Sequence, residues 1–213
     1  MPEISPFLTH VPGTPGADEF VRDLRSKARR HGVELSLQDQ AWVPFGNGMR
    51  VNGYFDPDPP VLACACGKDP ALWFPVLLHE SSHMDQWVER TPEWMGYPGL
   101  EQTDSWLSGE DVDPHVVRSE VAGAIRLELD CERRTLAKVR EFRLEPVVDP
   151  VEYARKANAY LLFYLWMLRS RRWYSIGREP YNIPEVVSAM PDSLDIDHTR
   201  LDPAIAAIFD KNL

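Results

Sequence analysis

The residues best suited to chemistry lie in one short segment, His79-Glu80-Ser81-Ser82-His83, which has the pattern HExxH. Residues four apart on a helix face the same way, so both imidazoles can bind one metal ion. Glu80 follows the first histidine, where its carboxylate can take a proton from a metal-bound water whose pKa has fallen to about 7. The spacing therefore predicts a Zn²⁺ site, with His79 and His83 as ligands and Glu80 as the catalytic base.

A zinc hydrolase needs a third protein ligand and leaves the fourth position to water. In the segment RLELDCERR, Glu128 and Glu132 both lie on the apolar stripe of a predicted helix. We expect Glu128 to be the third ligand. Glu132 is the alternative, either as ligand or as the residue that orients a metal-bound histidine through its other ring nitrogen. Both could instead pair with neighbouring arginines, and Cys131 is expected to pack in the core.

Other chemistries compete with this interpretation. Cys64 and Cys66 alternate on one face of a predicted strand and could supply a thiolate ligand, although core packing is favoured. His115 is a further candidate ligand just before the Glu128 helix. The segment from Glu80 to His83 also has the Glu-x-x-His pattern of di-iron proteins, which need a second copy that this chain lacks. Four tyrosines could stabilise an oxyanion: Tyr160, Tyr164, Tyr174 and Tyr181.

The motifs HESSH and ELDCERR together resemble the gluzincin type of zincin metallopeptidase. The resemblance implies that Glu128 is a zinc ligand and that Glu132 stands where the family usually has Asp. The order of a short sheet, the motif helix and a ligand helix also resembles the minimal zincins. In those proteins the strand before the motif helix pairs with an extended substrate, a role that residues 61–66 could take. The pieces HESSHMDQW and RKANAYLLFY look like a group of HExxH proteins associated with tailed phages, which implies no activity.

The elements that must position these residues follow from hydrophobic periodicity and turn signals. They predict an α+β fold, a small antiparallel sheet followed by a mainly helical zincin-like core in a single domain, 1–213. The expected strands are 33–37, 50–55 and 60–66. The expected helices are 17–30, a motif helix from 69–70 or 75 to 91, 116–142 and 150–172. Residues 1–16 are expected to form an extended arm, and 91–115 a long loop that could act as a lid.

Composition narrows the function further. The chain has 23 basic and 33 acidic residues, a net charge of -10, which would repel nucleic acid and an anionic membrane. The sequence shows no signal-peptide pattern and no run of about 20 apolar residues, so we expect a cytoplasmic protein with reduced cysteines. The predicted function is a zinc-dependent peptidase acting on a peptide or protein. The alternatives are a non-catalytic zinc-binding structural or interaction protein, or a di-iron carboxylate protein.

Overall fold

The computed structural model describes residues 14–46 and 48–213, so most of the expected arm, 1–16, lies outside the described residues. The chain divides into two compact units. The first unit contains the residues up to Thr91 and Arg134–Pro150, and the second contains Pro92–Arg133 and Val151–Leu213. The α+β class is confirmed, because strands occur in the first unit and the second is helical. The expectation of a single domain stays a prediction.

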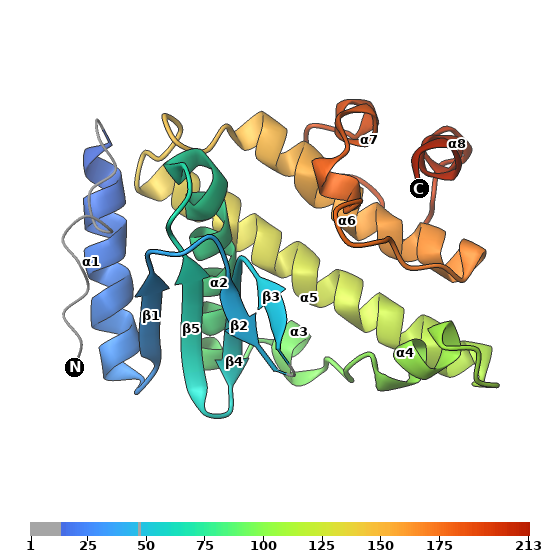
Figure 1. Cartoon of the computed structure of the whole chain (residues 1–213), viewed down its shortest axis with the longest axis horizontal. Coiled ribbons are helices and arrows are strands. Elements are labelled where there is room, and N and C mark those ends of the chain that lie inside the picture. The colour runs from blue at the N-terminus through green and yellow to red at the C-terminus, as the bar shows by residue number, and fades with distance from the viewer. Residues whose placement is uncertain (1–13, 47) are drawn as a thin grey trace. The chain divides into compact units, whose positions relative to one another are not determined.

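The first unit is built on a three-stranded sheet in the order β1-β5-β4 (Figure 1). Strand β4 (Gly53–Pro57) pairs antiparallel with β5 (Pro60–Ala65), whereas β1 (Glu34–Gln38) pairs with β5 in parallel. The expectation of an entirely antiparallel sheet is therefore wrong. Strand β1 pairs with the side of β5 opposite β4 and runs in the same direction as β5. Strand β5 is central and paired on both sides, so β4, not residues 61–66, forms the edge of this sheet next to the motif helix.

A second, two-stranded sheet covers one face of the first. Strands β2 (Val43–Phe45) and β3 (Met49–Val51) pair antiparallel within a stretch where the sequence suggested mainly a turn. Val43 packs with Ala63 and Ala65 of β5, and the rings of Phe45 and Tyr54 lie 4.7 Å apart. Helix α1 (Pro15–Arg30) lies beside β1 and buries an apolar face at helical spacing, as predicted: Ala17, Phe20, Val21, Leu24 and Ala28.

The motif helix α2 (Pro70–Glu89) packs on β4 and β5. Its first turn is fixed by Asp69, whose side chain accepts a hydrogen bond from the backbone N–H of Ala71, and by Pro70 at the first helical position. The helix therefore begins at the first of the two predicted starts, and Pro75 lies inside it. It ends at Arg90, which has a left-handed φ of 53°. The fully buried residues Phe74, Leu77, Leu78 and Met84 anchor the helix that carries the histidines.

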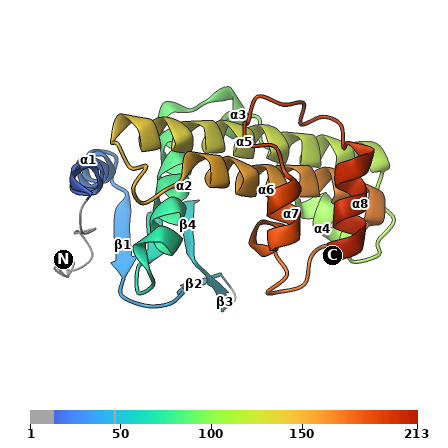
Figure 2. The same cartoon turned by 90° about the horizontal axis from the view of Figure 1, so that it is seen from above.

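The second unit contains the part of α5 (Pro114–Glu141) up to Arg133, α6 (Pro150–Ser170) from Val151 onward, and several shorter helices. Figure 2 shows α7 (Pro184–Ala189) and α8 (Pro203–Asn212) side by side next to α6. The short helix η2 (Pro180–Asn182) precedes α7. Phe163, Trp166 and Phe209 are fully buried between these helices. None of the helices in the described ranges is both long and apolar enough to cross a membrane.

The segment expected to be a loop, 91–115, contains α3 (Pro92–Met95) and α4 (Glu101–Leu107). Helix α4 is fixed at both ends. Glu120 accepts hydrogen bonds from the backbone N–H groups of Gln102, at 3.2 Å, and Thr103, at 2.7 Å. At the other end, Arg171 Nε donates to the carbonyl of Trp106 at 2.8 Å. The loop prediction is wrong here because the residues that cap α4 come from α5 and from the end of α6.

Candidate metal centre

The two histidines of the motif face each other on α2. Their Nε2 atoms lie 3.1 Å apart, and the rings are nearly perpendicular, at 87°. Two nitrogens bound at 2.0–2.1 Å to a tetrahedral zinc ion are separated by about 3.3 Å. The spacing of His79 and His83 therefore fits two ligands of one ion, as the sequence predicted.

A third side chain of α2 orients one of these rings. Gln86 is fully buried, and its Oε1 lies 2.9 Å from Nδ1 of His83. Because an amide oxygen only accepts, Nδ1 carries the proton and Nε2 keeps the lone pair that binds a metal. The sequence predicted such a role only for Glu132, and Gln86 was missed. The signal was present, since Gln86 is three residues after His83 and so lies beside it on the helix.

Glu80, the expected base, lies over the edge strand β4. A Cβ atom added to Gly53 would lie 3.3 Å from Cγ of Glu80 and 2.8 Å from Cγ1 of Val76. Glycine at this position therefore leaves space beside the Glu80 side chain. Because residue 53 is paired with Cys64 in the sheet, Glu80 also lies near the Cys64 thiol.

The thiols beside Glu80 are buried core groups. Cys64 and Cys66 are both buried, and Cys64 Sγ donates to the carbonyl of Trp73 at 3.7 Å. A hydrogen bond with Cys66, burial and the negative charge of Glu80 together raise the pKa of the Cys64 thiol far above its usual value. A thiol that stays protonated is a poor metal ligand. The structure thus favours the packing role that the sequence predicted for this pair.

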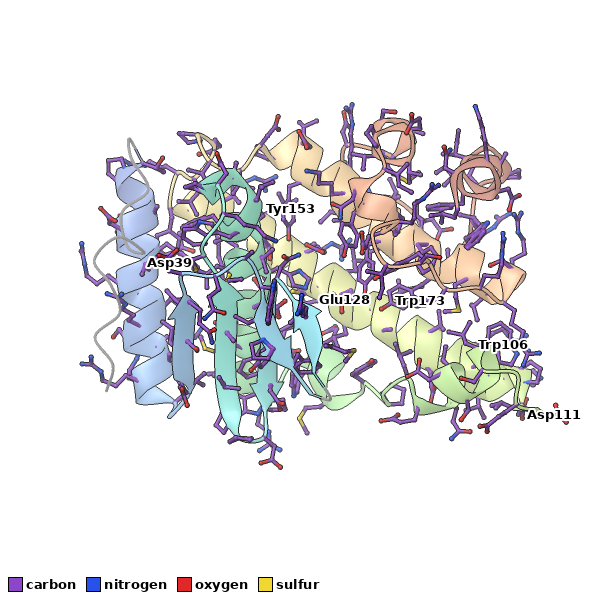
Figure 3. The ribbon with its side chains drawn as sticks, in the orientation of Figure 1. Asp39, Trp106, Asp111, Glu128, Tyr153 and Trp173 are labelled. Carbon is purple, nitrogen blue, oxygen red and sulfur yellow. The ribbon has the colours of Figure 1, made fainter. Side chains whose placement is uncertain are left out.

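In the second unit, Glu128 lies near the middle of α5 and is half-buried (Figure 3). Burial, and then the charge of Glu128, raise the pKa of Tyr97 to about 12. Burial and then the charge of Glu128 are also the two main causes that raise the pKa of Tyr164. Both also raise the pKa of Tyr160, whose hydroxyl lies 2.8 Å from that of Tyr164. Two of the four tyrosines predicted as hydroxyl donors thus lie near Glu128. Tyr97, in the segment expected to be a loop, was missed.

The other acid of the α5 segment has a different environment. Glu132 is buried, and its Oε2 accepts a short hydrogen bond from the hydroxyl of Tyr153 on α6. Cys131 is fully buried on the same helix. It is three residues after Glu128, so the two side chains are neighbours on the helix surface. The sequence predicts that Cys131, three helical positions from Glu128, faces away from it and packs in the core; the burial is confirmed, but the thiol and a Glu128 carboxylate oxygen lie within 4.8 Å of each other.

Each unit offers a pair of side chains with metal-ligand atoms: His79 and His83 in the first unit, and Glu128 and Cys131 in the second. Two imidazoles, one carboxylate and one thiol suit zinc, a borderline-soft ion that binds nitrogen, oxygen and sulfur. These side chains include one carboxylate, whereas di-iron sites of the ferritin type use several. His115 is not among them; it is exposed, and its Nδ1 lies 3.4 Å from a guanidinium nitrogen of Arg118.

Comparisons of this chain with protein-family models, with curated proteins and with solved structures find no match. The resemblance to gluzincins therefore rests on the residues of HESSH and ELDCERR themselves.

Proposed function

We propose that this protein is a zinc-dependent peptidase in which His79, His83 and Glu128 hold the metal and Glu80 is the catalytic base. The observation that carries the proposal is the histidine pair, whose facing Nε2 atoms are 3.1 Å apart while Gln86 holds the far side of one ring. Two histidines packed only for stability do not need to turn the same ring nitrogen towards each other.

The choice of Glu128 as third ligand is supported by the continuity of α5. Within the first unit, the hydroxyl of Thr135 on α5 lies 3.0 Å from that of Ser82 on α2. Residues rise by about 1.5 Å along a helix, so Cys131 follows about 6 Å back along α5 and Glu128 about 10 Å back. The α5 helix that contacts the motif helix through Thr135 thus continues along the chain into the segment that carries Glu128 and Cys131. Glu132, in contrast, already accepts a hydrogen bond from Tyr153.

The residues of this chain have defined tasks in the proposed reaction. A bound zinc ion would act as a Lewis acid that polarises the scissile carbonyl and makes water more acidic. The Glu80 carboxylate accepts the proton of the attacking water and then passes it to the departing amine nitrogen. Gly53 keeps space beside the Glu80 side chain. The product of these steps is a cleaved amide bond.

A second candidate function follows from Cys131. A thiolate in the fourth position would close the site, as in structural zinc centres with no open position for water. Full burial of Cys131 and its place next to Glu128 on the helix favour this candidate. The protein would then be a zinc-stabilised structural or interaction protein.

The test combines elemental analysis of the purified protein with hydrolysis of a fluorogenic peptide library. The peptidase proposal expects about one zinc per chain, lost in His79→Ala and Glu128→Ala. It also expects Glu80→Gln to keep its zinc while hydrolysis falls at least about 100-fold. Cys131→Ser separates the two candidates, because it keeps zinc and activity in a peptidase but loses zinc from a closed structural site. Wild-type protein without zinc would contradict both.

A further inference from the structure

Two aromatic side chains lie beside the metal-binding motif in the first unit, one on each of the two elements that meet there. Phe55 is on the edge strand β4 and Trp87 is on the motif helix α2. Their ring centroids are 5.7 Å apart, and the rings are inclined at 53° to each other. Both side chains are half-buried, so part of each ring surface is accessible. The proposed reaction assigns no task to this aromatic pair.

The alternation of side chains along β4 places Phe55 on the face that meets α2. Residues two apart on a strand point to the same face. A Cβ atom added to Gly53 would meet Val76 and Glu80 of α2, so this face of the strand is directed towards the motif helix. The contact of Phe55 with Trp87 agrees with this direction. Along this face of β4, a glycine beside the proposed base is therefore followed by an aromatic ring.

The same order is found along α2. Trp87 follows the metal ligand His83 by four residues and Glu80 by seven, so the three side chains lie on one face of the helix. Residues rise by about 1.5 Å along a helix, so Trp87 lies about 6 Å beyond His83 along the axis. The aromatic pair is thus about one helical turn from the motif, and all of these residues belong to the first unit.

This spacing matches the repeat of an extended peptide. Residues of a strand are about 3.3 Å apart, so Phe55 lies about 7 Å along β4 from Gly53. A peptide lying along β4 with its scissile bond beside Glu80 would bring a side chain about two residues from that bond onto the aromatic pair. An apolar side chain would there lose contact with water against large, rigid rings. An acidic side chain would lose its hydration without gaining a hydrogen-bond donor from either ring face.

We propose that Phe55 and Trp87 bind a large apolar side chain of the substrate, about two residues from the cleaved bond, and so determine specificity. The inference rests on the proposed function, because Glu80 and His83 define where the scissile bond lies. It names the substrate class: peptides or proteins with an aromatic or large aliphatic residue near the cleavage position. Neither ring takes part in proton transfer or in metal binding.

The first test measures peptide binding to Glu80→Gln protein, in which the proposed reaction is blocked. Fluorescein-labelled octapeptides of Gly and Ser, with Phe, Leu, Ala, Asp or Lys at one variable position, are titrated by fluorescence anisotropy. The Phe and Leu peptides should bind at least about 10-fold more tightly than the Ala and Asp peptides, because apolar contacts discriminate between side chains by about that factor or more. Adding Trp87→Ala should reduce this preference to about twofold, and Trp87→Phe, which keeps a ring, should restore most of it.

Phe45 provides the matched control in the same unit. It forms a second aromatic pair with Tyr54, whose ring lies 4.7 Å away and which points to the opposite face of β4 from Phe55. In the Glu80→Gln protein, Phe55→Leu should lower the preference for the Phe peptide at least about fivefold, whereas Phe45→Leu should leave it unchanged. Urea denaturation shows whether each variant is folded, and Phe55→Leu replaces Trp87→Ala as the test if the latter does not fold.

Hydrolysis by the otherwise wild-type protein is the second test. Trp87→Ala and Phe55→Leu should raise KM for apolar peptides and leave kcat nearly unchanged, because the contact is made equally in the ground state and the transition state. A preference for Asp or Lys over Phe, a preference for Phe that survives both substitutions, or no peptide binding at all would overturn the inference. Hydrolysis that continues in those cases leaves the proposed function standing. Binding that depends on Trp87 without any hydrolysis by the wild type would overturn the peptidase function and leave the aromatic pair as a binding surface for apolar peptides.

Discussion

The hydrogen bond between Gln86 and His83 gives a sharp prediction about metal affinity. Replacing Gln86 by Met keeps an unbranched side chain of similar length but removes the acceptor 2.9 Å from Nδ1 of His83. The ring would then be free to turn and to carry its proton on Nε2, the nitrogen needed for the metal. We expect Gln86→Met to bind zinc more weakly while keeping its helical content.

The expected size of this effect follows from burial. Gln86 is 0% exposed, so water cannot easily replace the lost acceptor, and a buried donor left without a partner costs about 1–3 kcal/mol. Substitutions of residues that hold a metal-bound histidine typically weaken binding about 10–100-fold, or about 1.4–2.7 kcal/mol. The two estimates agree. Gln86→Glu should behave in the opposite way, because a carboxylate acceptor forms a stronger, charge-assisted bond and raises the basicity of the ring.

The assay is competition for Zn²⁺ with a chromophoric chelator at about neutral pH. Gln38→Met is the matched control: Gln38 lies on β1, where its amide donates to Ser36, and its loss should leave zinc affinity unchanged. The reasoning is refuted if Gln86→Met binds zinc as tightly as wild type, or if Gln86→Glu binds as weakly as Gln86→Met.

Three further predictions address the surroundings of the site and the stability of the fold. Asp85→Asn should lower the free energy of unfolding by about 3 kcal/mol in urea denaturation, because the largely buried Lys27 and Lys138 each lose their shortest ion pair. Glu89→Gln should cost less than about 1 kcal/mol, because Glu89 is 48% exposed and lies 4.0 Å from Lys27. Equal losses in these two variants would show that the ion pairs of Asp85 are not effectively buried. Gly53→Ala should reduce peptide hydrolysis more than zinc affinity, because the new methyl group would crowd Glu80 but neither histidine. Equal losses of hydrolysis and zinc affinity would contradict the role of Gly53 in leaving space for Glu80. Burial and the charge of a nearby arginine lower the pKa of His198, so the unfolded chain binds the proton more readily. The free energy of unfolding should therefore fall as pH drops below about 6.5. In thermal melts from about pH 7.5 to 5, His198→Gln should lose less stability than wild type. An equal loss in the two proteins would contradict this role of His198.

Much of the site could be predicted from the sequence because the positions of its histidines depend only on residues that are close together in the chain. The spacing of four between His79 and His83 fixes their common face on any helix, and the structure confirms that they face each other. The start of the motif helix was also readable, since Asp69 and Pro70 form a capping sequence. Gln86 could have been found in the same way, because its position relative to His83 depends only on helix geometry.

The sequence by itself also determined the α+β class and the long helices, since hydrophobic periodicity reports which face of an element is buried. The tertiary structure decided how those elements pair. The parallel pairing of β1 with β5 joins strands that are separated along the chain, and no local pattern encodes it. In the same way, α4 is a helix with fixed ends because Glu120 and Arg171 reach it from elsewhere in the second unit. The contact of Ser82 with Thr135 spans 53 residues. Such contacts depend on the packing of segments that are far apart in the chain. For that reason the sequence by itself leaves both Glu128 and Glu132 as possible ligands.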